Sequence, residues 1–212
     1  MDKKVKRILL TIIGTAVTGF SVGILRKAAL GTDPFTAFTT GCATALHSTY
    51  GTLYPFVIGV LLIFVFFLDK HYIGFGTILN LFIIGPIADF SLNLLNSVFE
   101  ADTLLIRSMT LAVAIFVLCF GASLYISADL GVSSYDAISL IMADKKVAQY
   151  RFCRIFTDVI CVILAFVLGA KTSIGIGTII TACGMGPIVQ FFVRNIGEKI
   201  IYGKNGNPDN CI

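Results

Sequence analysis

The stretch YIGFGTILNLFIIGPI at residues 72–87 returns as SIGIGTIITACGMGPI at residues 173–188, an offset of 101 positions. A second pair, ALGTDPFTA at 29–37 and DLGVSSYDA at 129–137, is offset by 100. Matched blocks in one order at nearly one spacing indicate an internal repeat. The sequence therefore predicts two repeats of about 100 residues, at 1–100 and 101–197, and a polar C-terminal tail at 198–212.

The composition is that of a membrane protein. Of the 212 residues, 57% are hydrophobic and 13% are charged, and the mean hydropathy is +0.92. Soluble domains contain about 25% charged residues. We therefore expect an all-α, polytopic helical membrane protein whose first partner is the lipid bilayer. The net charge of +4 does not call for a nucleic acid partner.

Each repeat contains one long apolar span, a short segment, and two further spans. The short segments run from 34 to about 48 and from 135 to 143. A nine-residue helix reaches only about 14 Å, whereas the hydrocarbon core is about 30 Å thick. The sequence thus predicts three spans and one short re-entrant helix per repeat. Because three is an odd number, the two repeats should be inverted, as in many transporters.

Basic residues support a multi-pass protein of the bacterial plasma membrane with both termini in the cytoplasm. The chain begins MDKKVKR, and Lys145, Lys146 and Arg151 follow the second short segment. The matching loop of the first repeat, HSTYGT at 47–52, has no Lys or Arg. Six spans explain this contrast by the positive-inside rule. Eight parallel spans place as many basic residues inside but leave the contrast unexplained, so both models stay open and six is preferred.

The start of each short helix is a candidate solute site. Asp33 followed by Pro34 is typical of a helix N-cap and first position. Paired broken helices at matching places in two repeats often mark a transport site near the midplane. The alternative is a pair of interfacial helices that only close the bundle. The candidate substrate-binding residues, at the short helices and at the openings of the third spans, are Asp33, Thr36, Asp136, Thr77, Asn80 and Thr178.

Three ionisable residues inside spans are candidates for coupling or gating charge: Asp89, Arg154 and Asp158. A charged residue at a helix centre costs about 2.5–3.5 kcal/mol on insertion scales, which favours a functional role. Asp158 has Arg154 as a partner four residues away, whereas Asp89 has none nearby in the sequence. A purely structural pair, or a hydrogen-bonded structural aspartate, is the alternative.

Catalysis and metal binding are not expected. The six cysteines include no C-x-x-C pair, and neither His47 nor His71 has a partner at zinc spacing. No arrangement of nucleophile and base is visible. We therefore expect no metal, no cofactor and no enzymatic activity.

A set of blocks resembles a family of small bacterial membrane proteins. These blocks are LGTDPFTAF, IGFGTILN with a later aspartate, and Arg154, Asp158, LGA, IGIGT and GP in the second half. They resemble the YczE/YitT-like family, closer to its YczE branch, over nearly the whole chain to about residue 197. In that family the first block reads Gly-x-x-Pro-Trp and the second Gly-Pro-Arg-Asp. Here Phe35 replaces the Trp and Ser133-Ser134-Tyr135 precedes Asp136.

The function expected from the sequence is that of a small inverted-repeat transporter or permease for a small-molecule solute. No ATP-binding motif is present, so movement would be driven by a gradient or by a partner protein. A homodimer or a larger transporter complex is possible at this size. The alternative is a non-transporting membrane scaffold or regulatory protein.

Overall fold

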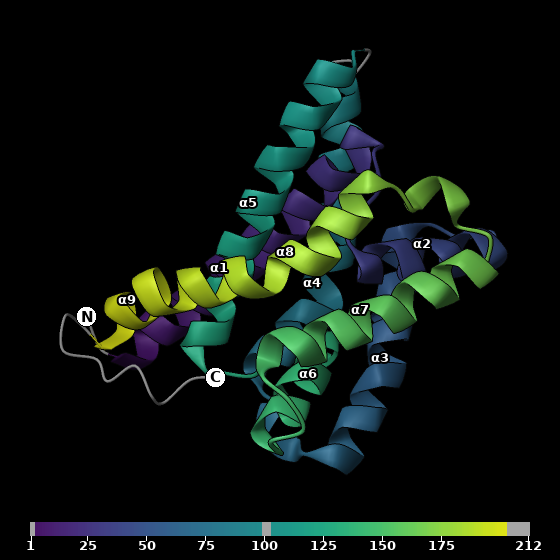
Figure 1. Cartoon of the computed structure of the whole chain (residues 1–212). Coiled ribbons are helices and arrows are strands. Elements are labelled where there is room, and N and C mark those ends of the chain that lie inside the picture. Colours follow the sequence, from purple (N-terminus) through teal and green to yellow (C-terminus); the bar gives the residue numbers. More distant parts are fainter. Residues whose placement is uncertain (1–2, 99–102, 203–212) are drawn as a thin grey trace.

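The computed structural model describes residues 3–98 and 103–202, and within them every regular element is a helix (Figure 1). The first half of the chain contains α1 (Lys3–Ala28), α2 (Pro34–Ala45), α3 (Tyr50–Leu68), the 3₁₀ turn η1 (Lys70–Tyr72) and α4 (Phe75–Val98). The second half contains α5 (Leu104–Ala128), α6 (Ser134–Asp144), α7 (Tyr150–Val167), the 3₁₀ turn η2 (Lys171–Ser173), α8 (Ile176–Phe192), the π-helical turn η3 (Val193–Gly197) and α9 (Glu198–Tyr202). The all-α prediction is confirmed.

Among the described residues, five helices are long and apolar enough to cross a membrane. They are α1, α3, α4, α5 and the continuous stretch from α8 to Ile201. The sixth predicted span falls on α7, which has 18 residues, three of them charged: Arg151, Arg154 and Asp158. These five helices support the prediction of a multi-pass protein. The helix α7 is not among them, because its charged residues make it less apolar.

The helix α7 is apolar on its outer face and polar on its inner face. Phe156 and Ile163 are exposed, whereas Arg154 and Asp158 are buried. A helix that faced water would show the opposite arrangement. Its polar residues therefore lie inside the bundle, and its exposed face suits contact with lipid.

Both short segments form short helices, as predicted, and an N-cap residue precedes each of them. Asp33 is the N-cap of α2, where its carboxylate accepts a hydrogen bond from the Thr36 amide at 3.0 Å. Pro34 occupies the first position, where no amide donor is needed. Ser133 is the N-cap residue of α6, but its side chain makes no capping hydrogen bond. With 12 and 11 residues, α2 and α6 are too short to span a bilayer.

The long helices α1 and α5 lie side by side and run antiparallel (Figure 1). Arg7, near the start of α1, forms an ion pair with Asp129 just after α5, at 3.7 Å. Arg107, near the start of α5, donates to the Ala28 carbonyl at the end of α1, at 2.9 Å. A basic residue near a helix C-terminus is favourable because the last carbonyls carry partial negative charge. Each helix thus supplies the cation that stabilises the end of the other.

The two halves are joined again at two matching turns. The Gly177 amide donates to the Leu30 carbonyl at 2.9 Å, and the Gly76 amide donates to the Leu130 carbonyl at 2.7 Å. Each turn before a short helix is therefore held by the loop that opens the last long helix of the other half. Tyr72 of η1 adds a hydrogen bond to Asp144 at the end of α6. Partial burial, followed by this bond and the Asp144 charge, raises the pKa of Tyr72, so its hydroxyl remains a donor.

Two threonines at these joints provide a matched test. Thr77 Oγ1 donates across the halves to the Val132 carbonyl at 2.8 Å, whereas Thr178 Oγ1 donates within its own half to Ser173, at 3.3 Å. We expect Thr77→Val to lower the free energy of unfolding by about 1 kcal/mol more than Thr178→Val, because it removes the bond between the halves. Unfolding in mixed detergent micelles measures both. Equal losses would contradict the role of Thr77 in joining the halves.

The predicted limits of the repeats fall partly outside the described residues. The boundary at 100/101 lies within 99–102, and most of the predicted tail lies within 203–212. The described beginning of that tail is the short helix α9.

Candidate functional site

A small buried cavity lies where the N-terminal ends of α2 and α6 meet. Its volume is about 50 Å³, and Asp33 and Ser133, the N-cap residues of the two short helices, both line it. Its remaining walls come from α1, α3, α4, α5, α7 and α8, so both halves contribute. One buried water needs roughly 10–15 Å³ of such space. The cavity therefore has room for a few waters or one very small solute.

Tyrosine is the commonest side chain in the cavity wall. Five of the seven tyrosines of the chain line it, and all five are buried: Tyr50, Tyr54, Tyr125, Tyr135 and Tyr150. Phe35 of α2 stacks on Tyr135 of α6 with 4.5 Å between the ring centroids. The first turns of the two short helices are thus packed together by an aromatic pair.

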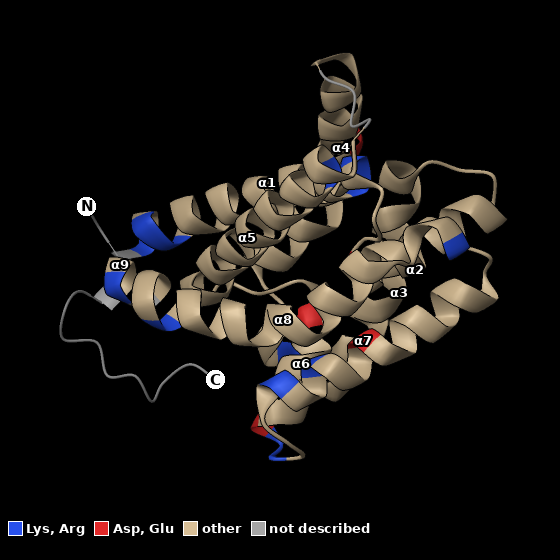
Figure 2. Ribbon diagram, turned by 45° about the horizontal axis from the view of Figure 1, so that its top comes forward, with Lys and Arg blue, Asp and Glu red and all other residues tan. Residues whose placement is uncertain are grey.

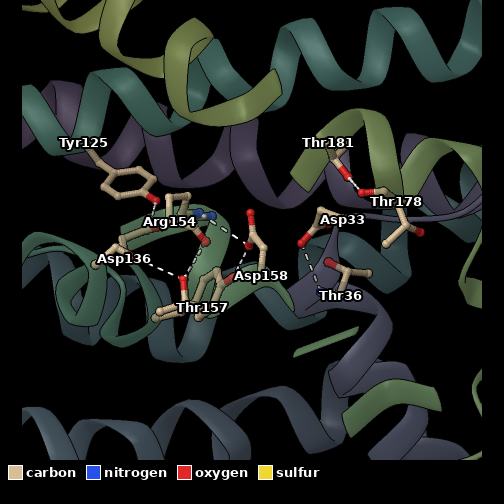
Figure 3. Close-up of polar contacts among 11 residues, drawn as sticks. Asp33, Thr36, Tyr125, Asp136, Arg154, Thr157, Asp158, Thr178 and Thr181 are labelled. Atoms are coloured by element: carbon tan, nitrogen blue, oxygen red, sulfur yellow. Dashed lines mark hydrogen bonds and ion pairs between the residues drawn. The ribbon is translucent and has the colours of Figure 1, made fainter. Parts of the chain in front are cut away.

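Arg154 on α7 is at the centre of the polar network shown in Figure 3. It forms an ion pair with Asp136 of α6, and its Nε lies 3.7 Å from Asp158 one turn further along α7. Its guanidinium lies 4.5 Å from the centroid of the Tyr135 ring. Asp136 also accepts from Tyr125, and Asp158 accepts from Tyr135. A buried arginine needs this number of partners because an unpaired buried charge costs several kcal/mol.

Asp33 faces this network from the other short helix (Figure 3). One carboxylate oxygen accepts from the Thr36 amide, whereas the other, Oδ1, is buried and has no hydrogen-bond partner. Asp33 interacts electrostatically with Arg154 but makes no ion pair with it. The Tyr50 hydroxyl is likewise buried without a partner. Buried polar atoms are normally satisfied, so these two acceptors are available for a ligand or for water.

The structure brings some of the predicted site residues together and separates others. Asp33, Thr36, Asp136 and Arg154 line the cavity, and Asp158 lies behind Arg154. The remaining three candidates for solute binding, Thr77, Asn80 and Thr178, are not among its lining residues. Thr77 and Thr178 accept the amides of Gly74 and Gly175 at the turns that open α4 and α8, at 3.2 and 3.1 Å. The Asn80 side chain donates to the Gly76 carbonyl within α4.

Asp89 has a partner that its sequence neighbourhood did not reveal. It forms an ion pair with Arg26 of α1 at 2.6 Å and accepts from the Gly51 amide at 2.7 Å. Both charged residues line an open pocket of about 340 Å³ beside the loop that joins α2 to α3. Tyr50 lines this open pocket as well as the buried cavity, and the Arg26 guanidinium lies 4.8 Å from its ring centroid. Tyr50 therefore lies between the open pocket and the cavity, with Arg26 and Asp89 beside it on the side of the open pocket.

Reasoning from the sequence missed the tyrosines and Arg26. A usable signal was present, because Tyr50 and Tyr150 are 100 residues apart, as are Phe35 and Tyr135. Aromatic residues at equivalent positions of two repeats, inside apolar segments that contain no tryptophan, mark a shared feature of the interior.

The chain matches the model of a family described as "Family of unknown function (DUF6198)" over residues 5–194. It belongs to this family. It is 25% identical over 193 residues to an uncharacterized protein of Haemophilus influenzae, covering 91% of this chain and 86% of that protein. It is 24% identical to the uncharacterized protein YyaS of Bacillus subtilis, covering 91% and 94% of the two chains.

A third relative is the uncharacterized membrane protein YczE of Bacillus subtilis. It is 25% identical over 181 residues, which cover 84% of this chain and 81% of that protein. This match confirms the predicted resemblance to YczE-like proteins. The chain is a membrane protein of a family whose function is not assigned. No solved structure matched the chain.

Proposed function

We propose that this protein is a small-solute transporter, in which two inverted halves bind the solute in the buried cavity between α2 and α6. One observation carries the proposal: the N-terminal ends of two short helices, one from each half, line the same cavity in a bundle with apolar outer faces. Backbone that is not helical at membrane depth persists only where it is buried in protein or lines a cavity. Paired helix ends of this kind are used for solute binding in transporters.

The antiparallel pairing of α1 with α5 supports the inversion. If both helices cross the membrane, their N-termini lie on opposite sides, and the same holds for the elements that follow each of them. The basic residues agree with a cytoplasmic N-terminus, since Lys and Arg are found at the start of α1, at α9 and at the α6–α7 turn (Figure 2). The α2–α3 loop, beside the open pocket, would then face the outside of the bacterial plasma membrane.

In this proposal the open pocket is the outer entrance and Arg26, Asp89 and Tyr50 form its gate. Opening requires that the Arg26–Asp89 pair separates and that the Tyr50 ring moves away from the cavity. Both charged side chains are partly exposed, with relative accessibilities of 18% and 27%. An ion pair that water can reach is weak, so it can break and re-form during a transport cycle.

Cysteine labelling tests the proposal without knowledge of the solute. In a variant whose native cysteines are replaced, Thr36→Cys places a thiol in the cavity wall, and Thr39→Cys places one at an equally buried position of α2 that does not line the cavity. Alternating access predicts that membrane-impermeant reagents label Thr36→Cys from either side, at different rates, and leave Thr39→Cys unlabelled. A Thr36→Cys thiol that resists reagents from both sides would favour the scaffold alternative.

The same background tests the inversion. Single cysteines at Ser48, in the α2–α3 loop, and at Lys145, in the α6–α7 turn, should be labelled from opposite faces of the membrane. Labelling from one face would support eight parallel spans and remove the basis for alternating access.

A further inference from the structure

The charges around the cavity do not balance. The carboxylates of Asp33, Asp136 and Asp158 face the single guanidinium of Arg154, which leaves a formal charge of −2 when all four groups are ionised. The N-terminal ends of α2 and α6 also point at the cavity, and each contributes about half a positive charge. With all four groups ionised, about one negative charge would therefore remain uncompensated in a buried site.

The unpartnered atoms show where a positive ligand would bind. Asp33 has only 7% of its surface exposed, and its Oδ1 lacks a hydrogen-bond partner. The Tyr50 hydroxyl, in the same wall, also lacks one. Both atoms can accept a hydrogen bond. Arg154 is ion-paired with Asp136 and Asp158, and its Nε is a further buried atom without a hydrogen-bond partner. A donor with a positive charge would satisfy both acceptors and balance the site.

The aromatic walls favour an organic cation over a metal ion. The faces of tyrosine rings attract cations, and the Arg154 guanidinium over Tyr135 shows one such contact in this site. Metal ions instead need several oxygen, nitrogen or sulfur ligands at short range. Within the described residues no three His, Cys, Asp or Glu side chains are grouped to hold one. The volume of about 50 Å³ limits the ligand to a very small ion.

We propose that the cavity binds a compact organic ammonium ion, of about the size of methylammonium, which donates hydrogen bonds to Asp33 Oδ1 and to the Tyr50 hydroxyl. This inference rests on the proposed function, because it names the solute class for the same cavity. The remaining N–H and C–H groups of the ion would lie against the tyrosine rings.

Protection from labelling tests this proposal. Purified Thr36→Cys protein, in the background without native cysteines, is labelled with a thiol reagent while methylammonium chloride is titrated at constant osmolality. Sodium chloride and sodium acetate are titrated in parallel. We expect methylammonium to slow the labelling saturably and the two sodium salts to leave it unchanged. Absence of protection, or equal protection by a sodium salt, would overturn the assignment.

The matched variants are Asp33→Asn and Asp69→Asn. Asparagine caps helices as well as aspartate does, so Asp33→Asn should fold but lose the protection. Asp69→Asn changes a carboxylate that caps η1, outside the cavity and the open pocket, and should keep it. Protection that survives in Asp33→Asn would also overturn the proposal. If Thr36→Cys is labelled from both sides but methylammonium does not protect it, the transporter proposal stands and the ammonium assignment fails.

Discussion

Replacing Arg154 with methionine should lower the free energy of unfolding by about 3–5 kcal/mol at neutral pH. Arg154 is 6% exposed and is the one cation among the buried carboxylates of Asp136, Asp158 and Asp33 in the described structure. Its removal leaves these carboxylates without their counter-charge in a site of low dielectric. Methionine matches the arginine side chain only as far as Nε, so it keeps the packing of the aliphatic part while it removes the guanidinium and its charge.

The effect can be measured with a thiol-reactive fluorophore during thermal unfolding, because Cys119, Cys153 and Cys161 are buried in the folded protein. The control is Arg151→Met, one turn earlier on the exposed side of α7, which should change stability little. The double variant Arg154→Met with Asp136→Asn should recover part of the loss, since it removes one of the unpaired charges. If Arg154→Met is as stable as Arg151→Met, the carboxylates are uncharged in the folded protein, and the charge imbalance behind the ammonium site disappears.

The elements that could be predicted from the sequence depend on local chemistry. The Asp33–Pro34 pair determines where α2 begins, because its carboxylate caps the amide of Thr36 and proline suits the next position. The lengths of α2 and α6 follow from where the apolar segments are interrupted. The loops within the matched blocks at 72–87 and 173–188 have equivalent contacts, since each of them holds the turn of the other half.

The rest of the site depends on contacts between distant residues. Arg26 and Asp89 are 63 positions apart, and their pairing follows from the packing of α1 on α4. Helical spacing identified Asp158 as the partner of Arg154, but the ion pair between α6 and α7 joins Arg154 to Asp136, which is 18 positions away. Helical periodicity finds neighbours three or four residues apart on one helix. It contains no information on which face of α6 meets which face of α7.

The turns that join the halves predict a second large effect, at Gly31 and Gly131. Both have positive φ angles, +104° and +95°, in a region that favours glycine. Both also touch the backbone of the other half: a Cβ on Gly31 would lie 2.6 Å from the Gly175 amide nitrogen, and one on Gly131 would lie 2.5 Å from the Gly74 nitrogen. Real Cβ atoms do not approach backbone this closely, so the substitution must push the halves apart.

Three alanine substitutions separate the causes of this effect. Gly59→Ala, inside α3 with open space around it, should be neutral or stabilise the protein by up to about 1 kcal/mol through helix propensity. Gly169→Ala, with φ of +83° and open space, should cost about 1–2 kcal/mol through backbone strain alone. Gly31→Ala adds the overlap with the other half, and we expect a loss of about 3 kcal/mol or more in the free energy of unfolding.

Thermal unfolding of the three variants measures how much stability each of them loses. Gly131→Ala repeats the experiment at the matching turn. If Gly31→Ala and Gly131→Ala cost no more than Gly169→Ala, the turns are not held against the opposite half as described. The relative position of the two short helices would then depend on the Phe35–Tyr135 stack without support from the turns. A cavity whose walls come from both helices would lose part of the framework that holds the geometry for solute binding.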